Sequence, residues 1–543
     1  MKRHTPTWLN DAVFYQIYPQ SFYDTNGDGI GDLPGVIAKL DYIASLGVSA
    51  IWLNPFFVSP FNDAGYDVAD YYKVAPRYGS NDDVRELCEQ AHARDIRVIF
   101  DLVVGHCSWE HPWFVASCRE EPNAYSDWFI WTDSVWAPAP AGMEIIRGYS
   151  PRMGGYMTNF FVSQPAFNFG FAHPDPRYPW QQPVDAPGPR AVRAEVKDII
   201  RYWFDMGADG FRADMALSLV KGDLDRRATA EVWREIRAWL DTDYPEHVMI
   251  AEGGSPAVSI AGGGFHIDFC LPWSMPAYNS LFRKRVGNEG GSAAGVDAYS
   301  FSVFDGLGHG NVREFMDAYL RHYARTRDYG FISIPEGNHD LHPRISHGRN
   351  SEEILQVFLF TMTMPGVPFL YYGDEIGMRT VEGLPCTEGS FERAGVRTPM
   401  QWDDSPNAGF STAPADKLYL PIDPAPDRPT VGAQQDDPES LLNQMRALIS
   451  LRRSHLALRA DAGFQLLYAE RGRMPIVYQR QGDGQRVIVA INPTGQQAAV
   501  ALDLPGVASA PKALWGFADA FRKDATQWRI ELPAASGGIY EVA

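Results

Sequence analysis

This sequence has no CxxC cysteine pair, no excess of basic charge and no long apolar run. It has five cysteines, an odd number without any CxxC pair, so we expect neither a disulfide framework nor a zinc site. The formal net charge of −19 argues against nucleic acids and anionic membranes as partners, because both require basic patches. Residues 1–19 have no signal-like apolar core and no transmembrane-length apolar run follows, so the sequence predicts a cytoplasmic protein.

Several well-known catalytic motifs are absent as well. The chain has no nucleophile elbow, no glycine-rich phosphate loop and no HExxH helix. What the chain does have is length and aromatic residues. Its 543 residues exceed the size of one hydrophobic core, which predicts a large domain with an accessory unit. An aromatic share of 13% suits flat, partly hydroxylated ligands, and equally suits a large aromatic core.

Short apolar runs alternate with amphipathic stretches through most of the chain. The apolar runs predict strands and the amphipathic stretches predict helices, for example at 35–48, 80–95 and 190–206. Repeated strand–helix units of this number favour a closed (β/α)₈ TIM barrel, an α/β fold, over an open sheet. The strands are expected at residues 13–19, 50–55, 98–104, 209–214, 248–252, 265–271, 331–335 and 367–373.

Two segments depart from this alternation. A long stretch rich in Trp, Pro and Gly follows the third strand, and a loop of that length predicts a small inserted domain. After about residue 460 the pattern changes to alternating strands joined by tight turns, which predicts a C-terminal antiparallel β-sandwich. We therefore expect a catalytic barrel at 1–104 and 190–458, an inserted domain at 105–189 and the sandwich at 459–543.

Charged and polar side chains stand at the predicted ends of the strands, where (β/α)₈ barrels carry their active sites. One such residue alone is more often a helix cap or a surface charge, but a series in barrel order indicates a site. Converging carboxylates with histidines and no phosphate loop point to acid/base or nucleophilic carboxylate chemistry on a polyol, with glycoside hydrolysis as the leading case. The residues are Asp67, Asp101, His106, Arg212, Asp214, Glu252, His339 and Asp340.

The segment "GFRAD", residues 210–214, alternates charged and apolar side chains in a strand that should be buried. A buried unpaired charge costs several kcal/mol, so we expect Arg212 and Asp214 to be paired. Arg212 would lower the pKa of Asp214 and keep it ionised as a nucleophile. Asp101 on the neighbouring strand would hold Arg212 with both oxygens. Glu252 follows the apolar "VMIA" and should stay protonated near neutral pH as a general acid.

Seven segments occur together in a familiar order: "DAVFYQIYPQSF", "GYDVADYY", "DLVVGH", "GFRAD", "AEGG", "GNHD" and "RTPMQWDDSPNAGFS". With them the sequence resembles glycoside hydrolase family 13, the α-amylase family, and looks closest to its oligo-1,6-glucosidase and α-glucosidase branch. The resemblance implies a retaining mechanism in which Asp214 forms a covalent β-glycosyl intermediate. Glu252 would act as acid and then base, and Asp340 would bind the sugar 2- and 3-hydroxyls. His106 and His339 would donate hydrogen bonds in the same subsite.

The resemblance also implies residues that hold the rest of the sugar. Asp67, with an arginine of "FERAGVRTPMQW", resembles the pair that binds the terminal glucose 4-hydroxyl in exo-acting members. We choose Arg397 for this pair over Arg393; an ordinary salt bridge is the alternative. Tyr66 is expected to stack on the sugar face, or else to be part of the core.

Three positions depart from the family pattern. The family usually has Asn where this chain has Gly105, and in α-amylases that Asn helps hold a calcium ion, so we do not expect that calcium site. The segment "QPAFN" (164–168) differs from the frequent "QPDLN", which weakens assignment to the 1,6-specific subgroup. Met215 after the nucleophile matches neither the usual 1,6 nor the usual 1,4 residue. The linkage preference stays open.

The segment "DTNGDGIGD" has oxygen-bearing side chains at alternate positions, as in a calcium-binding loop. It lacks the glutamate that completes an EF-hand. A similar loop is a structural Ca²⁺ or Mg²⁺ site in the oligo-1,6-glucosidase branch. We expect a structural cation here and no cofactor for the chemistry; a purely hydrogen-bonded Asx turn is the alternative. The expected ligands are Asp24, Asn26, Asp28, the Ile30 carbonyl and Asp32.

These observations predict a retaining α-glucosidase-like hydrolase that acts on short α-glucosides or oligosaccharides through a covalent β-glucosyl-enzyme. A transglucosylase or a trehalose-synthase-like sugar isomerase would use the same catalytic residues and is the alternative. An inactive sugar-binding protein is disfavoured because all three catalytic carboxylates are present. Chain length of the substrate and oligomeric state cannot be read from the sequence.

Overall fold

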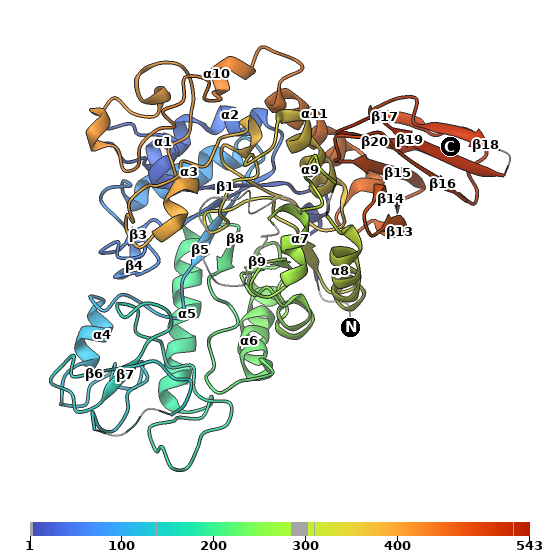
Figure 1. The fold of residues 1–543 in the computed structure, drawn as a ribbon. Coiled ribbons are helices and arrows are strands. Elements are labelled where there is room, and N and C mark those ends of the chain that lie inside the picture. Colours follow the sequence, from blue (N-terminus) through green and yellow to red (C-terminus); the bar gives the residue numbers. More distant parts are fainter. Residues whose placement is uncertain are drawn as a thin grey trace.

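Eight parallel strands form the centre of the molecule (Figure 1). The structure is a computed structural model and describes residues 4–136, 138, 140–283, 302–308, 310–524 and 526–542. The order in the sheet is β11-β10-β9-β8-β5-β2-β1-β12. These strands are β1 (Phe14–Ile17), β2 (Ala50–Leu53), β5 (Arg97–Leu102), β8 (Gly210–Ala213), β9 (Val248–Ala251), β10 (Ile267–Phe269), β11 (Phe331–Ser333) and β12 (Phe369–Tyr371).

The sheet curls into a nearly closed barrel, because β1 pairs with both β2 and β12. The remaining seam lies between β11 and β12. There the backbone N–H of Tyr371 donates to Glu336 Oε1 at 3.1 Å, so a side chain just beyond β11 contacts β12. The predicted (β/α)₈ barrel is confirmed.

Residues alternate along each strand between the barrel interior and the surrounding helices, as the two-residue period requires. In β8, Phe211 and Ala213 pack in the large cluster that includes the helices. Ala50 and Trp52 of β2 pack in a second cluster, together with Phe14, inside the barrel. The same alternation turns Arg212 to the interior.

Helices follow most of the strands and cover the outside of the barrel (Figure 1). The predicted helix at 80–95 begins with a capping box, in which Ser80 and Asp83 each accept the other's backbone N–H. The expected helix at 35–48 is instead two short helices that break at Lys39. The helices are α1 (Leu33–Ala38), α2 (Leu40–Ser45), α3 (Asn81–His92), α5 (Pro187–Asp205), α6 (Arg227–Asp243), α7 (Asn279–Phe282), α8 (Val312–Thr326), α9 (Ser351–Thr363), α10 (Val431–Gln434) and α11 (Leu441–Ser454).

The segment between β5 and α5 forms a separate lobe, at the lower left of Figure 1. Its regular elements are α4 (Pro112–Ser117), β6 (Ile145–Arg147) and β7 (Gly155–Met157). Aromatic rings build its core: Phe114 lies 4.9 Å from Tyr156 and 5.1 Å from Phe129 between ring centroids. This lobe corresponds to the predicted insertion.

The C-terminal part consists of two antiparallel sheets, in the orders β13-β14-β15-β20-β17 and β16-β19-β18. In β15, Ile488 and Ala490 pack in the cluster with the second sheet, whereas Val487, Val489 and Ile491 pack in the large cluster with the barrel. The five-stranded sheet therefore has two buried faces, and the predicted sandwich is confirmed. The strands are β13 (Gly463–Glu470), β14 (Arg473–Gly482), β15 (Gln485–Asn492), β16 (Ala498–Leu502), β17 (Lys512–Gly516), β18 (Phe521–Asp524), β19 (Gln527–Leu532) and β20 (Ser536–Glu541).

The domain boundaries at 105, 190 and 459 stay predictions. The nearest regular elements are α5, which begins at Pro187, and β13, which begins at Gly463. A short antiparallel pair, β3 (Phe57–Val58) and β4 (Asp70–Val74), follows β2 and frames the loop that reaches the site.

Candidate active site

The parallel register of β5, β8 and β9 brings the expected catalytic residues together. Asp101 of β5 pairs with Arg212 of β8, and the last residues of β8 and β9 pair with each other. Asp214 and Glu252 come directly after these last residues, so they end neighbouring strands at the same level. Because side chains alternate along a strand, Arg212 and Asp214 share the inner face.

Arg212 lies among three carboxylates, those of Asp101, Asp214 and Glu252. Its Nη1 donates to Asp101 Oδ1 at 2.6 Å and to Asp214 Oδ1 at 2.9 Å. Its Nη2 lies 3.1 Å from Glu252 Oε2, which also accepts the backbone N–H of Met215 at 2.9 Å. One guanidinium therefore contacts both Asp214 and Glu252. This pairing explains how Arg212 can be only 2% exposed.

Asp101 does not hold Arg212 with both oxygens, so the bidentate contact expected from the sequence is wrong. Its Oδ2 accepts instead from the Tyr66 hydroxyl at 2.9 Å and from Trp52 Nε1 at 3.3 Å. Asp101 thus connects Arg212 to a second group of polar residues on β2 and the loop after it.

A tight turn presents Asp340 to the cavity. The Asn338 side chain accepts the backbone N–H of Asp340 at 2.8 Å and so shapes the turn. Asp340 Oδ1 accepts from Arg393 at 2.6 Å and from Arg397 at 3.0 Å. Its Oδ2 lies 3.2 Å from His339 Nε2. Asp340 is therefore held from two sides, with its carboxylate directed at the cavity.

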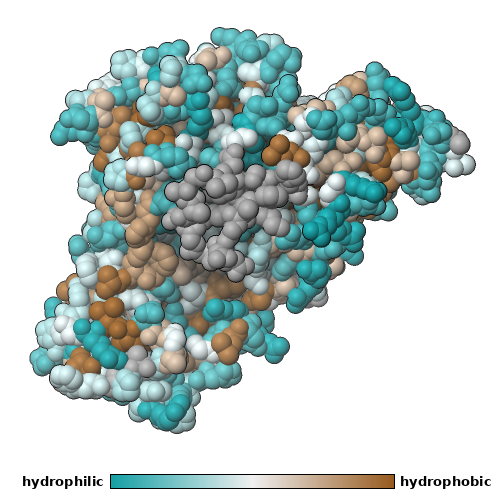
Figure 2. Space-filling view, in the orientation of Figure 1, coloured by the Kyte–Doolittle hydropathy of each residue, from teal (hydrophilic) through white to brown (hydrophobic). Residues whose placement is uncertain are grey.

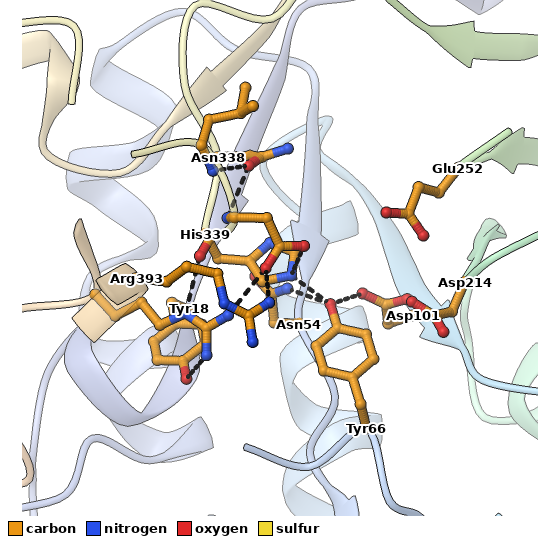
Figure 3. A network of polar contacts seen from close by, with 12 residues as sticks. Tyr18, Asn54, Tyr66, Asp101, Asp214, Glu252, Asn338, His339 and Arg393 are labelled. Carbon is orange, nitrogen blue, oxygen red and sulfur yellow. Dashed lines mark hydrogen bonds and ion pairs between the residues drawn. The ribbon is translucent and has the colours of Figure 1, made fainter. Parts of the chain in front are cut away.

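Hydrogen bonds assign the proton of His339 to Nε2. The Gln16 amide nitrogen lies 2.9 Å from His339 Nδ1 and can only donate, so Nδ1 accepts. Nε2 then faces the Tyr66 hydroxyl at 2.8 Å (Figure 3). Nε2 also faces the Asp340 carboxylate. The Tyr66 ring stacks on the His339 ring at 5.5 Å and its hydroxyl also accepts from Asn54 at 2.8 Å. His339 is 1% exposed and supports Asp340 from behind.

His106 is fixed in the same way. The Lys221 ammonium donates to Asn159 Oδ1 at 2.9 Å, which turns the Asn159 amide nitrogen to His106 Nδ1 at 3.1 Å. The proton of His106 is then on Nε2, which donates to the Tyr66 carbonyl at 3.0 Å. Burial lowers the pKa of His106 to about 4, so the ring is neutral. Lys221 thereby links the barrel to the inserted segment close to Gly105.

A cavity of about 370 Å³ opens above these residues. Its lining divides into a polar part and an apolar part. The polar part contains the three expected catalytic carboxylates, Tyr66 and His106, and also Asp63 and Arg393. The apolar part consists of Phe160, Met215 and Trp273.

Asp67 does not line the cavity, contrary to the role expected from the sequence. Its carboxylate accepts from the Ser59 hydroxyl at 2.8 Å and from the backbone N–H groups of Asn62 and Asp63 at 2.9 and 3.1 Å. Asp67 is fully buried and shapes the turn that presents Asp63. The carboxylate in the cavity is that of Asp63, which also accepts from Gln164 at 2.7 Å.

The choice of Arg397 over Arg393 is not supported by the positions of the two side chains. Arg397 is 1% exposed and donates to the His339 carbonyl at 2.8 Å as well as to Asp340. Arg393 lines the cavity and lies 3.9 Å from Asp63. The pair at the end of the cavity is therefore Asp63 with Arg393.

The α-amylase catalytic-domain family matches this chain at residues 16–262 and 296–461. The match spans the barrel, the inserted lobe and all three carboxylates described above. The chain belongs to the α-amylase family, glycoside hydrolase family 13. It is a glycoside-active enzyme of the glucosidase and transglucosylase type. Its substrates are carbohydrates.

The similar proteins within the α-amylase family include both trehalose or trehalulose synthases and glucosidases. The trehalose synthase/amylase TreS of Mycobacterium tuberculosis is 33% identical over 527 residues, which cover 90% of this chain and 82% of that one. The oligo-1,6-glucosidase of Parageobacillus thermoglucosidasius is 30% identical over 514 residues, 82% of this chain and 84% of that one. The solved structure of the trehalulose synthase MutB from Pseudomonas mesoacidophila MX-45 superposes with a TM-score of 0.79 at 25% identity, covering 99% of this chain and 100% of that one.

The three carboxylates of this α-amylase-family site have different pKa values because their surroundings differ. Burial raises the pKa of Glu252 to about 8 and that of Asp214 to about 7, although Arg212 lowers both. Arg212 does lower the pKa of Asp214, but burial raises it by more, so the net shift is opposite to the lowered pKa expected from the sequence. Burial also raises the pKa of Asp340, and His339, Arg393 and Arg397 more than offset this and bring it well below its usual value. Asp214 thus loses its proton before Glu252 does.

The loop at residues 24–32 is held by its own hydrogen bonds. Asp24 accepts the backbone N–H groups of Gly27 and Gly29, each at 2.8 Å, and Asp28 accepts that of Ile30 at 2.9 Å. Asp32 caps α1 by accepting from Gly35 at 2.7 Å. Within the described residues, no three His, Cys, Asp or Glu side chains converge as a metal site. The cation expected here stays a prediction.

Among the described parts of the chain, no helix is long and apolar enough to span a bilayer. The cytoplasmic location expected from the sequence stays a prediction.

Sequence reasoning missed Asp63, Phe160 and Trp273 as cavity residues. The aspartate pair in "NDAGYD" was the available signal for Asp63, since either carboxylate could reach the barrel mouth.

Proposed function

We propose that this enzyme is a retaining α-glucosidase-type glycoside hydrolase that acts on short α-glucosides. The observation that carries the proposal is the contact of one guanidinium, Arg212, with both Asp214 and Glu252. Retaining enzymes need their two working carboxylates about 5–5.5 Å apart. One carboxylate attacks the anomeric carbon while the other protonates the glycosidic oxygen that leaves this carbon. Contact with the same arginine supports a short separation of this kind between Asp214 and Glu252.

In the proposed first step, Asp214 attacks the anomeric carbon of the bound glucosyl unit. The bond from that carbon to the glycosidic oxygen breaks, and Glu252 gives its proton to that oxygen. In the second step, Glu252 takes a proton from a water molecule, whose oxygen attacks the anomeric carbon and displaces Asp214. Each step inverts the carbon, so the product keeps the α configuration.

The remaining polar residues would bind the glucosyl unit. Asp340 is anionic and held by two arginines, so it can accept hydrogen bonds from two neighbouring hydroxyls. Asp63 and Arg393 end the cavity and would bind the 4-hydroxyl of a terminal glucose. Tyr66 would face one side of the ring. These roles limit the substrate to a terminal glucosyl residue.

Transfer to a sugar, as in an isomerase, is a second candidate. The other part of the cavity offers Phe160, Met215 and Trp273, and none of these three has a charged group. Trp273 is 57% exposed and Phe160 is 53% exposed, which suits stacking on a sugar face. A sugar held by stacking alone can turn and present another hydroxyl to the intermediate. The likeness to trehalose synthases supports this candidate.

We also propose that the loop at residues 24–32 binds a structural Ca²⁺ or Mg²⁺ ion. Its support is the spacing of the oxygen-bearing residues Asp24, Asn26, Asp28 and Asp32. The ion would stabilise the loop and take no part in the chemistry.

The two candidates are separated by incubating the enzyme with a panel of α-linked glucose disaccharides and identifying the products by chromatography. Glucose as the sole product supports hydrolysis. A rearranged disaccharide formed at constant total sugar supports the isomerase. Proton NMR taken in the first minutes of hydrolysis gives the anomer, and β-glucose as the initial product would contradict both candidates.

A further inference from the structure

Two loops meet at the closed end of the cavity. Residues 59–67 carry Asp63, and residues 383–397 carry Arg393. The loops touch through their backbones at Gly389, where an added Cβ would lie 2.5 Å from the Asn62 carbonyl oxygen. Arg393 Nη2 donates to the Gly389 carbonyl at 3.0 Å. The separation of Asp63 and Arg393 therefore depends on how these loops are held together.

Both loops contain strained backbone. Phe61 and Ala64 in the first loop have φ values of 60° and 48°, and Glu388 and Phe391 in the second have 48° and 49°. Residues with a side chain rarely adopt this left-handed region, so surrounding contacts must stabilise it. A side chain that contacts both Phe61 and Glu388 would stabilise both loops at the same time.

Arg77 makes this contact. Its Nη1 and Nη2 donate to the two carboxylate oxygens of Glu388 at 2.6 and 3.0 Å. Its guanidinium carbon lies 3.2 Å from the centre of the Phe61 ring. A further bond from Nη2 to the Tyr78 hydroxyl, at 2.7 Å, fixes the plane of the guanidinium. The side chains of Arg77 and Glu388 are 16% and 19% exposed, so water screens this pair only partly.

Arg77 comes from neither loop. It lies between β4 and α3, in a segment whose ends are fixed by those two elements. Arg77 and Glu388 do not belong to the lining of the cavity. Any effect of this pair on the substrate must therefore act through the loops.

We propose that Arg77 and Glu388 form a positioning pair that sets the closed end of the cavity and thereby restricts the enzyme to terminal glucosyl residues. The proposal rests on the function proposed above. Asp63 and Arg393 lie 3.9 Å apart, and with the Arg77–Glu388 pair intact they would block a further sugar beyond the 4-hydroxyl. With the pair broken, the loops separate, the 4-hydroxyl loses its partners and a second glucosyl unit can extend through the gap.

The test compares two chromogenic substrates. p-Nitrophenyl α-glucoside needs only the terminal subsite, whereas direct release of p-nitrophenol from p-nitrophenyl α-maltoside needs space for one more glucose. The variants are Glu388→Gln, which keeps the shape of the side chain, and Arg77→Gln. Small displacements at an active site can lower catalytic efficiency by up to about 100-fold. We therefore expect the KM for the glucoside to rise about tenfold. We expect kcat to change less than about threefold, because the catalytic carboxylates stay in place.

The ratio of maltoside to glucoside cleavage is the decisive quantity, since mere loss of stability does not change it. We expect this ratio to rise in both variants and to rise less in Arg77→Lys, which keeps the charge but cannot reach both oxygens. The matched control is Arg97→Gln, which breaks an ion pair of 2.8 Å with Asp209 where β5 begins, at the other end of the barrel.

An unchanged ratio and KM in folded Glu388→Gln and Arg77→Gln would overturn the inference, as would equal changes in Arg97→Gln. Wild-type enzyme that releases nothing from p-nitrophenyl α-glucoside and rearranges no disaccharide would instead overturn the proposed function. Thermal unfolding of each variant establishes that it is folded.

Discussion

The two parts of the cavity are built on different principles. In the polar part, Asp214, Glu252 and Asp340 are each fixed by an arginine, and those arginines are in turn held by buried neighbours. In the apolar part, Phe160 and Trp273 are more than half exposed. The inserted lobe, at the lower left of Figure 2, carries further exposed apolar side chains, among them Val115, Met153 and Val162.

This difference predicts that the polar part recognises one sugar specifically and that the apolar part accepts several different groups. Directed hydrogen bonds and charges specify which sugar occupies the polar part and in what orientation. Stacking on aromatic faces depends little on the position of individual hydroxyls, so the apolar part can accept several leaving groups. Under the proposed function, the polar part would carry out the chemistry, and the apolar part would decide between water and a sugar as the acceptor.

The largest expected effect comes from removing the proposed nucleophile, Asp214. Asp214→Asn keeps the shape of the side chain but cannot form the glycosyl ester. We expect kcat on a disaccharide to fall by roughly 10⁴-fold or more, with little change in thermal stability. Steady-state kinetics and calorimetry measure both. The control is Asp41→Asn, an aspartate whose side chain is 87% exposed in α2. Near-normal turnover in Asp214→Asn would refute the assignment.

The pH profile tests the ordering of the two working carboxylates. Under the proposed mechanism, protonation of Asp214 below about pH 7 would remove the nucleophile, and loss of the Glu252 proton above about pH 8 would remove the acid. We expect a narrow bell for kcat/KM, with limbs that belong to the coupled pair and fall about tenfold per pH unit.

A substrate whose leaving group needs no proton sharpens this test. With α-glucosyl fluoride, the alkaline limb of kcat/KM should disappear while the acidic limb stays. An alkaline limb that is identical for both substrates would show that Glu252 is not the acid.

A smaller effect is expected at the apolar part. Trp273→Ala removes a stacking surface, so we expect kcat/KM for a disaccharide to fall roughly three- to tenfold. The proportion of transfer products should fall too, because the acceptor is held less well. Trp136→Ala, at an 85% exposed tryptophan outside the cavity lining, is the matched control. A change of equal size in both variants would exclude a specific role for Trp273.

The smallest effect concerns the loop at residues 24–32. If it binds a cation, a chelator should lower the unfolding temperature by a few degrees and leave kcat at low temperature unchanged. Asp28→Asn keeps the acceptor for the Ile30 N–H but removes a charge, so it should raise the cation concentration needed to restore stability. Chelation without any shift would favour the hydrogen-bonded turn.

Much of the polar part could be predicted from the sequence because strand geometry determines it. The two-residue alternation of "GFRAD" places Arg212 and Asp214 on the inner face, and the position of Glu252 at the end of the next strand places it beside them. Such arguments need only the periodicity of a strand and the rule that barrel sites lie at strand ends.

The loops could not be predicted in this way. Asp63 and Asp67 are four residues apart, and which of them faces the cavity depends on a turn with left-handed backbone at Phe61 and Ala64. Arg393 and Arg397 differ for the same reason, since tertiary contacts set the course of their loop. The single helix expected at 35–48 broke at Lys39, which amphipathic periodicity does not reveal.

The most direct test of the central claim is to trap the glycosyl-enzyme with 5-fluoro-α-glucosyl fluoride and locate the label by peptide mass spectrometry. The account predicts one hexose-sized adduct per chain on the peptide that contains Asp214. An adduct on any other carboxylate, or turnover that releases β-glucose with no adduct, would contradict it.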